Sequence, residues 1–548
     1  MQVQIGRRLV WLSAIVLLML AALGGRLYHL QVVKNVEYTQ IAHDQRTLSV
    51  PLTEGRGLIV DRNGEPLSDP RQSWQIAAFL PLMTDGGTTE AEELSRLLGE
   101  PLVDLLEAFP DKGAAWLDPA VPLTEEQAAM AEEAGLTGIA LGSRQERVGP
   151  DALARQLMGY ANARGGAQGL ELAFDKELKG GAAPALTAYL DGRGNPLAGL
   201  GIRAVVSTAD KEPYQVVTTI DKRFQAAVEE ALDKRGNTLP AAAVVMDPAT
   251  GEVLAMASRP EMTYPVRDPN SPTLYNRAVR EQPPGSSFKA IIAAAALEAG
   301  KVKPDERFYC DGHEEFNGWN VTDAGHGWLT FRDAVAKSCN IVFAKVGVER
   351  LGIKGMREAA QRFGFGAETL ALGRPWADEH PGAIPGLTDP SAPQMSIGQG
   401  SLEVTPLQLA RAYSAIANGG NLPAAKLIRA VKSPAGEVVE RPAAGRPQRV
   451  ISKETAATVQ KLLAGVTEPG KGGTGQLAWV AGAGSAGKTG SAETAAKGVI
   501  HAWFAGYLPQ FKPKWVIVVL VEDGKWGSQA AAPIFSEIGR RLLAITGY

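Results

Sequence analysis

The sequence predicts an α+β protein in three parts: a membrane anchor helix, a mixed α/β region, and a C-terminal domain with an antiparallel sheet and a helical insert. Three observations predict this arrangement. The chain has 548 residues, too many for one hydrophobic core. A long uncharged apolar stretch lies near its N-terminus. Strand patterns at both ends of the C-terminal part enclose a long helix-rich segment. The expected boundaries are 1–33, 34–214 and 215–548.

The first part is expected to be a single transmembrane helix. Leu9 to Gly25 carry no charge, and Arg7 and Arg8 precede them. At about 1.5 Å per residue this stretch rises roughly 26 Å, close to the hydrocarbon thickness of about 30 Å. The alternative, a cleaved signal peptide, lacks a clear A-x-A site. In either case the positive-inside rule places everything after Arg26 outside the cytoplasm.

Composition narrows the classes of function. The chain has 45% hydrophobic and 21% charged residues, which is typical of a globular protein. Its net charge of -3 gives no reason to expect a nucleic-acid partner. The six histidines show no H-E-x-x-H spacing and there is no C-x-x-C, so no metal or other cofactor is expected. Two cysteines, Cys310 and Cys339, are too few for a disulfide framework, and whether they pair is open.

The middle part reads as mixed α/β without recognisable chemistry. The expected elements are a helical stem at 31–47, a strand running into an Asn-Gly turn at 56–64, helical patterns across 85–160, and a helix at 170–178.

The C-terminal part opens and closes with strands. The expected elements are a strand at 215–220, a helix at 222–234, a hairpin of strands at 241–246 and 252–257, further strands at 501–508 and 515–521, and an amphipathic helix at 529–545. A sheet assembled from both ends of the domain follows from this order.

A helix that starts after Pro283 and Pro284 places Ser286 and Lys289 on one face, at i and i+3. A serine hydroxyl becomes a good nucleophile when a base takes its proton, and an amine does this only when neutral. Free lysine titrates near 10.4, so work near pH 7 to 8 needs its pKa lowered by about 3 units. The apolar neighbours, such as Phe288, predict the necessary burial. Alone, S-x-x-K is a weak signal, and a second copy spans 485–488.

Ser338 and Asn340 lie between two predicted helices, where a hydroxyl and an amide can face a cleft together. The simpler alternative is that Asn340 caps the helix that follows.

The run Lys488, Thr489, Gly490 and Ser491 is followed by the strand at 501–508. A cationic, hydroxyl-bearing strand edge suits an anionic, extended peptide that adds to the sheet. Gly482 to Thr489 also fits the phosphate-loop pattern G-x-x-x-x-G-K-[ST]. The sequence disfavours that alternative, because the strands after it suit a hairpin better than a parallel nucleotide-binding sheet.

The three motifs, in this order, resemble those of penicillin-binding proteins and class A β-lactamases. Their spacings of 52 and 150 residues (338 minus 286, 488 minus 338) are similar to those of the large penicillin-binding proteins. Further resembling stretches are 56–64, 169–171, 244–260, 396–400 and 404–408. With no room for a glycosyltransferase domain, the chain is most similar to a class B, monofunctional member. The resemblance implies a pedestal (dimerisation-type) domain at 34–214 and a β-lactamase-like transpeptidase domain at 215–548.

The resemblance also implies roles for the motif residues in peptidoglycan cross-linking, with β-lactams as inhibitors. Ser286 would attack the D-Ala-D-Ala carbonyl, and its first base would be Lys289 or the pair Ser338 and Lys488. The other implied roles are proton relay by Ser338, substrate-amide binding by Asn340, carboxylate binding by Lys488 and Thr489, and an oxyanion hole from the backbone N–H groups of Ser286 and Ser491, beside Gly490. Ser491 stands where the family often has threonine, so a hydroxyl is kept.

The implied partners are peptidoglycan stem peptides, β-lactams, the membrane through the N-terminal helix and, by analogy, a membrane glycan polymerase of the SEDS type. Two other functions compete. A β-lactamase needs a group that activates water, and the sequence identifies none. A non-catalytic sensor needs further membrane spans or an effector domain, and neither is apparent. A role in elongation, division or sporulation, and the acceptor diamino acid, stay open.

Overall fold

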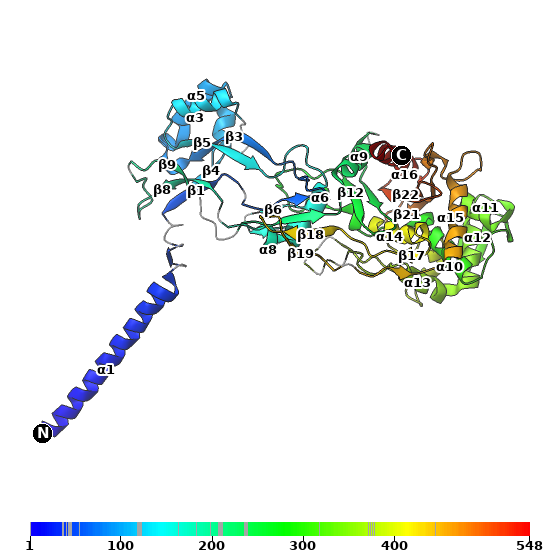
Figure 1. The fold of residues 1–548 in the computed structure, drawn as a ribbon, viewed down its shortest axis with the longest axis horizontal. Coiled ribbons are helices and arrows are strands. Elements are labelled where there is room, and N and C mark those ends of the chain that lie inside the picture. The colour runs from blue at the N-terminus through cyan, green and yellow to red at the C-terminus, as the bar shows by residue number, and fades with distance from the viewer. Residues whose placement is uncertain are drawn as a thin grey trace. The chain divides into compact units, whose positions relative to one another are not determined.

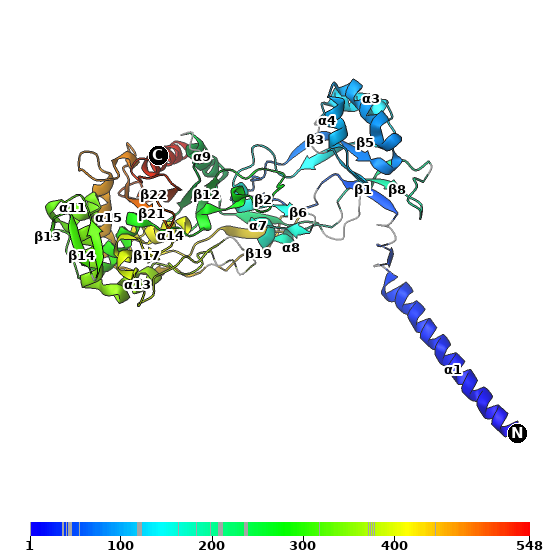
Figure 2. The same ribbon diagram turned by 180° about the vertical axis from the view of Figure 1, so that it is seen from behind.

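The computed structural model describes residues 2–548 except 36–37, 40, 42–45, 54, 118–122, 163, 182, 198, 206–211, 235–238, 317, 371, 373, 375, 377–378 and 444. The chain forms two compact units whose segments alternate along the sequence (Figure 1, Figure 2). The first unit contains 1–55, 71–147 and 181–210, and the second contains 56–70, 148–180 and 211–548. The domain boundaries predicted from the sequence stay a prediction.

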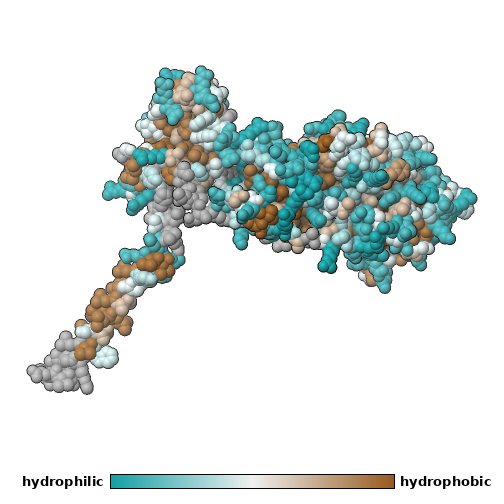
Figure 3. All heavy atoms as spheres, viewed as in Figure 1, coloured by the Kyte–Doolittle hydropathy of each residue, from teal (hydrophilic) through white to brown (hydrophobic). Residues whose placement is uncertain are grey.

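An N-terminal helix, α1 (Gln2–Tyr28), continues into a π-helical turn, η1 (His29–Val33). Within it, Val10–Val33 is a stretch of 24 residues that is long and apolar enough to cross a membrane. Large side chains such as Trp11 and Leu18 are exposed along it. Figure 3 shows brown, hydrophobic residues along most of this helix. Of the helical stem predicted at 31–47, residues 31–33, 35, 38–39 and 41 are helical and Thr47 begins a strand, while 36–37, 40 and 42–45 lie outside the described residues.

Besides α1, the described part of the first unit contains two three-stranded sheets and the α-helices α3, α4 and α5. The sheets have the orders β1-β8-β9 and β4-β3-β5. The bounds are β1 (Thr47–Pro51), β8 (Ala185–Tyr189), β9 (Ile202–Val205), β3 (Arg71–Phe79), β4 (Ala114–Trp116), β5 (Ile139–Glu146), η2 (Leu80–Leu82), η3 (Asp85–Gly87), α3 (Thr88–Leu98), α4 (Leu102–Ala108) and α5 (Glu125–Glu133). The interpretation of 85–160 as helical therefore missed β4 and β5. β5 is half polar and lacks alternation, and its strand form comes from pairing with β3.

Two early segments of the chain, 56–70 and 148–180, belong to the second unit, and ion pairs of Arg56 join them. Arg56 forms ion pairs with Glu171 at 2.9 Å and with Asp175 at 2.7 Å. The predicted strand at 56–64 shrinks to the two residues of β2, and Asn63 and Gly64 form the expected turn. The bounds here are β2 (Ile59–Val60), α6 (Arg155–Met158), β6 (Ala161–Asn162), β7 (Gly165–Gly166), α7 (Gly169–Ala173) and α8 (Asp175–Leu178). Strand β2 ends a sheet of order β19-β18-β10-β2, made with β10 (Gln215–Thr218), β18 (Ile428–Lys432) and β19 (Val438–Glu440).

A five-stranded sheet of order β12-β11-β23-β22-β21 forms the centre of the second unit. Every neighbouring pair is antiparallel. Its strands come from both ends of the domain, as the sequence predicts: β11 (Ala241–Met246), β12 (Val253–Arg259), β21 (Ala486–Glu493), β22 (Ile500–Leu508) and β23 (Trp515–Val521). Along β11, Val245 packs with α9 (Lys222–Asp233) and α16 (Ala531–Thr546). Val244 packs with the opposite core around α10 (Lys289–Glu298), α14 (Pro406–Ala417) and α15 (Lys453–Thr467), so helices cover both faces.

The insert between β12 and β21 is mainly helical and carries small hairpins. Besides α10, α14 and α15 it contains η4 (Pro272–Leu274), η5 (Arg277–Val279), η6 (Gly285–Phe288), β13 (Arg307–Cys310), β14 (His313–Phe316), β15 (Trp319–Thr322), β16 (Gly327–Thr330), α11 (Phe331–Lys337), α12 (Asn340–Ala344), η7 (Lys345–Leu351), α13 (Gly352–Arg362), η8 (Ala392–Ile397), β17 (Asn421–Leu422), β20 (Gln448–Arg449) and η9 (Gln476–Ala478).

Candidate active site

Ser286 lies in η6, the short 3₁₀ turn that leads into α10. Gly285 before it is left-handed, with φ of 55°, and its N–H donates to the carbonyl of Gly398 at 2.8 Å. The Ser286 side chain is half-buried, and its hydroxyl makes no hydrogen bond to any residue that the structure describes. The chain thus holds this hydroxyl at a helix start and leaves it available to a ligand.

Lys289 is fully buried one turn later, and its amine contacts the second motif. Nζ donates to the carbonyl of Ser338 and to Oδ1 of Asn340, each at 2.6 Å, and lies 3.3 Å from Oγ of Ser338. It also lies 5.3 Å from the ring centre of Phe343. Ser286 is therefore partly exposed at the start of the helix, whereas the Lys289 amine lies in the interior.

Burial controls the protonation of both lysines in the site. Burial lowers the pKa of Lys289 to about 8, against an opposing pull from Asp323 and Cys339. Burial, reinforced by the charge of Lys289, holds the pKa of Lys488 well below its usual value. The Lys488 amine donates to the backbone carbonyl of Thr489 at 3.2 Å. A fraction of Lys289 is therefore neutral near pH 7 to 8 and able to accept a proton.

The turn from Ser338 to Asn340 joins α11 to α12. Ser338 ends α11 in the left-handed conformation, with φ of 62°, which is uncommon for a serine. The alternative that Asn340 only caps a helix is wrong, because the N-cap of α12 is Cys339 and no side chain caps it. Asn340 is instead held on three sides: besides accepting from Lys289, its Nδ2 donates to the Thr322 carbonyl at 3.3 Å and its N–H donates to Asp323 at 2.5 Å.

Strand β21 carries the third motif, and it is the edge strand of the central sheet. Thr489 is buried, with its hydroxyl 2.8 Å from that of Thr474. The Ser491 hydroxyl is half-buried and accepts from the N–H of Gly527 at 3.2 Å. The phosphate-loop alternative is wrong, because this segment forms a strand where that motif requires a helix. The Ser485 of the second S-x-x-K precedes the same strand and donates to the carbonyl of Ala478.

Gly490 brings β21 against the serine turn. A Cβ atom at this position would lie 2.7 Å from the carbonyl oxygen of Pro284 and 2.9 Å from Cβ of Trp503. A Cβ on Gly285 would likewise lie 2.7 Å from the carbonyl oxygen of Ser491. Only residues without a side chain permit this approach, so the two glycines set the distance between the first and third motifs.

Sequence reasoning missed four residues that support the motifs: Thr474, Gly527, Asp323 and Tyr413. The buried Tyr413 hydroxyl donates to the carbonyl of Ser287, next to the candidate nucleophile, at 2.7 Å. These residues lie far from the motifs in sequence and follow no spacing rule, so no signal in a single sequence finds them.

Residues 241–540 match the family described as "Penicillin binding protein transpeptidase domain". The match covers more than half of the chain. The chain belongs to this penicillin-binding protein family. The family and the α+β fold class predicted from the sequence are thereby confirmed.

Named relatives agree with this membership. "Stage V sporulation protein D" of Bacillus subtilis is 28% identical, over 100% of this chain and 86% of the relative. "Probable peptidoglycan D,D-transpeptidase PbpC" of Pseudomonas aeruginosa is 31% identical, over 96% of this chain and 93% of the relative. Among solved structures, penicillin-binding protein 3 of Mycobacterium tuberculosis, complexed with aztreonam, is 26% identical with a TM-score of 0.63, and the alignment covers 91% of this chain and 97% of that one.

Proposed function

We propose that the chain is a serine D,D-transpeptidase that cross-links peptidoglycan stem peptides through an acyl-enzyme on Ser286, and that β-lactams inhibit it. The family and the printed names of the relatives support D,D-transpeptidase activity. The observation that carries the mechanism is the fully buried Lys289 amine, whose pKa of about 8 makes it a base near neutrality, one helical turn from Ser286.

Acylation begins when the Ser286 hydroxyl loses its proton to the neutral amine. The proton passes to Lys289 directly or through the Ser338 hydroxyl, which lies 3.3 Å from Nζ. The serine oxygen then attacks the carbonyl carbon of the penultimate D-alanine. When the tetrahedral intermediate breaks its C–N bond, the terminal D-alanine leaves with that proton on its nitrogen. The backbone N–H groups of Ser286 and Ser491 are the proposed oxyanion hole.

The substrate peptide is proposed to add to the open edge of β21. Thr489 and Ser491 would bind the carboxylate end, since their hydroxyls belong to this edge strand. Lys488 is fully buried and its pKa is depressed, which supports proton transfer with Ser338 over direct carboxylate binding. Both lysines therefore stay candidates for the first base. Asn340 would hold the substrate amide after Lys289 releases its Oδ1.

Transfer to an amine, rather than to water, completes the proposed reaction. The printed names of the relatives, which are D,D-transpeptidases, support a long-lived ester over the fast hydrolysis of a β-lactamase. An amine of a neighbouring stem peptide then attacks the ester carbonyl carbon and loses a proton to the site base. The ester C–O bond breaks, the base returns that proton to the Ser286 oxygen, and a new amide bond remains.

We place this reaction outside the cytoplasm. The apolar helix α1 would anchor the chain as a single-pass membrane protein, and Arg7 and Arg8 would keep its N-terminus inside. A glycan polymerase of the SEDS type in the same membrane is the proposed partner, by analogy with the monofunctional class.

A transpeptidation assay with the full-length chain in detergent tests the proposal. A donor pentapeptide and an amine acceptor are supplied, and cross-linked product and free D-alanine are measured. Ser286→Ala should abolish both. The matched control is Ser485→Ala, in the second S-x-x-K, which should remain active because its hydroxyl only bonds to Ala478. Product formation by Ser286→Ala at the wild-type rate would refute the assignment of the nucleophile.

A further inference from the structure

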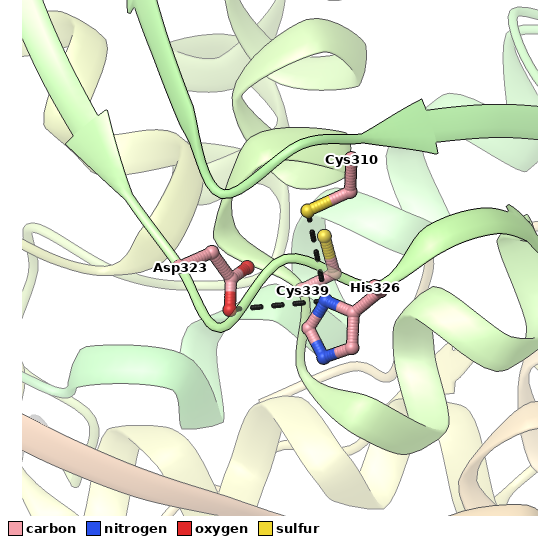
Figure 4. A group of neighbouring side chains, drawn as sticks. All are labelled: Cys310, Asp323, His326 and Cys339. Atoms are coloured by element: carbon pink, nitrogen blue, oxygen red, sulfur yellow. Dashed lines mark hydrogen bonds and ion pairs between the residues drawn. The ribbon is translucent and has the colours of Figure 1, made fainter.

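Four side chains of metal-ligand type converge beside the Ser338 to Asn340 turn. They are Cys310, Asp323, His326 and Cys339, and Figure 4 shows them pointing toward one another. One ligand atom from each lies within 4.8 Å of all the others. Both cysteines are buried free thiols, and the other two residues are partly buried.

The fold collects these residues from three places, with Asp323 and His326 in the same short connection between β15 (Trp319–Thr322) and β16 (Gly327–Thr330). Cys310 ends β13, Asp323 follows β15, His326 precedes β16, and Cys339 lies between α11 and α12. The pairing of Cys310 with Gly327 places His326 beside the first thiol. Because no two of them form a recognised short metal motif, a metal here was not expected from the sequence.

The distances fit a small tetrahedral site. Nδ1 of His326 lies 3.6 Å from Sγ of Cys310 and 3.8 Å from Oδ1 of Asp323. Zinc ligand bonds of about 2.0 to 2.3 Å in a tetrahedron imply ligand-to-ligand edges of roughly 3.3 to 3.8 Å. The longest separation, within 4.8 Å, needs a contraction of about 1 Å to reach such an edge.

We propose that Cys310, Asp323, His326 and Cys339 bind one zinc ion. Two thiolates and an imidazole favour zinc over the hard cations magnesium and calcium, which prefer oxygen ligands. With four protein ligands the coordination is complete, so the ion is structural and leaves no position for substrate. Binding replaces the two thiol protons, which are released to solvent.

The ion would stabilise the active site through Asp323. Oδ1 of this residue faces His326, while Oδ2 accepts from the N–H of Asn340 at 2.5 Å. One carboxylate therefore links the metal to the residue that accepts from Lys289. Cys339 makes the second link, since it lies between Ser338 and Asn340 in the sequence. A bound zinc would thus hold the turn directly at Cys339 and, through Asp323, at Asn340.

Zinc also leaves the charge of the cluster unchanged. Zinc carries two positive charges, and two thiolates with a carboxylate carry three negative ones, so the sum is one negative charge. The same cluster without zinc, with neutral thiols and an ionised Asp323, has the same sum. The ion therefore adds no net charge near Lys289, and the proposed effect of the ion is on the position of the turn.

Zinc content of the full-length chain in detergent tests the proposal. After dialysis against metal-free buffer, wild-type protein should hold about one zinc per chain, and its two thiols should react with a thiol reagent only after a strong chelator is added. Replacement by cobalt should give thiolate-to-cobalt charge-transfer absorption. Cys310→Ser and His326→Ala should each lose at least tenfold in zinc affinity. The control is His313→Ala, an exposed histidine on β14, which should bind zinc as wild type does.

Three outcomes would overturn the proposal. One is a wild-type zinc content no higher than that of Cys310→Ser. Another is a disulfide between Cys310 and Cys339, seen as a mass two hydrogens lower, in protein recovered from the membrane. The third is unchanged zinc affinity in His326→Ala. Circular dichroism of each variant shows that lost binding is not lost folding, and His326→Ala, in a partly exposed turn, covers the case in which Cys310→Ser fails to fold.

Discussion

The Lys289 amine donates a 2.6 Å hydrogen bond to Oδ1 of Asn340, 51 residues further along the chain. This bond joins the first and second motifs inside the molecule, while the Ser286 hydroxyl stays free of partners among the described residues. Before substrate binds, the candidate base is thus held by Asn340 and Ser338. In its neutral form the amine can keep these two donated bonds and take the proton of Ser286 on its lone pair.

Acylation by a penicillin should accelerate with pH. Burial lowers the pKa of Lys289 from 10.5 to about 8, so the neutral amine grows from about a tenth of the protein at pH 7 to about nine tenths at pH 9. The second-order rate constant of acylation should rise by about tenfold across this window and then level off. Stopped-flow measurement with a fluorescent penicillin checks this. A rate that falls from pH 7 to 9 would contradict the assignment of a neutral lysine as base.

The same shift affects stability. Above the folded pKa of about 8 and below 10.5, the unfolded chain binds a proton that the folded chain has lost. The burial of Lys289 therefore lowers the free energy of unfolding most below pH 8. The free energy of unfolding then rises as the pH increases from about 8 to 10.5.

Asn340→Asp should move the pH profile upward. The substitution puts a carboxylate within hydrogen-bond distance of the Lys289 amine, and an opposite charge this close raises a lysine pKa by about 1 to 3 units. At pH 7.5 the acylation rate should fall by about tenfold or more. The pH profile of acylation measures the shift. Asn320→Asp, at an exposed position of β15, is the control. Equal midpoints of the pH profile in the two variants would contradict the assignment of Lys289 as the base.

Gly490→Ala should damage acylation through packing alone. Its Cβ would lie 2.7 Å from the Pro284 carbonyl oxygen, which forces β21 away from the turn that carries Ser286. Misplacement by about 1 Å costs on the order of 100-fold in rate. The control is Gly465→Ala within α15, where nothing lies within 4 Å and helix propensity should add about 1 kcal/mol of stability. Labelling rates of both variants check the prediction, which fails if Gly490→Ala acylates as fast as Gly465→Ala.

Tyr413→Phe should destabilise the fold around the nucleophile. It removes the buried hydroxyl that donates to the Ser287 carbonyl at 2.7 Å, so that oxygen loses this donor. The expected loss is about 1 to 3 kcal/mol in the free energy of unfolding. Tyr309→Phe, on a half-exposed ring, should change it by less than about 0.5 kcal/mol. Denaturant titration compares the two, and equal midpoints would show that the Tyr413 bond contributes nothing.

The sequence predicted the central sheet well because its strands are apolar, well bounded and close to their turns. The hairpin of β11 and β12 and the pair β22 and β23 all appear where the patterns place them. The sequence pattern did not predict the strand β5, whose extended form depends on pairing with β3. It also gave no sign that 56–70 and 148–180 join the second unit, because ion pairs such as Arg56 with Glu171 leave no periodic pattern.

For the site, the sequence motifs identified the candidate residues but did not predict the contacts between them. Helical spacing placed Ser286 and Lys289 on one face, yet the contact of Lys289 with Asn340 depends on the left-handed turn at Ser338. The cluster around Cys339 was missed for the same reason, since its four residues come together only through tertiary structure.

Mass mapping of the full-length chain after labelling with a fluorescent penicillin tests most directly whether Ser286 is the acylated nucleophile. We expect one stable penicilloyl ester, located on the peptide that contains Ser286 and absent from Ser286→Ala. A label on any other peptide, or rapid release of the penicilloyl group as hydrolysed product, would contradict this expectation.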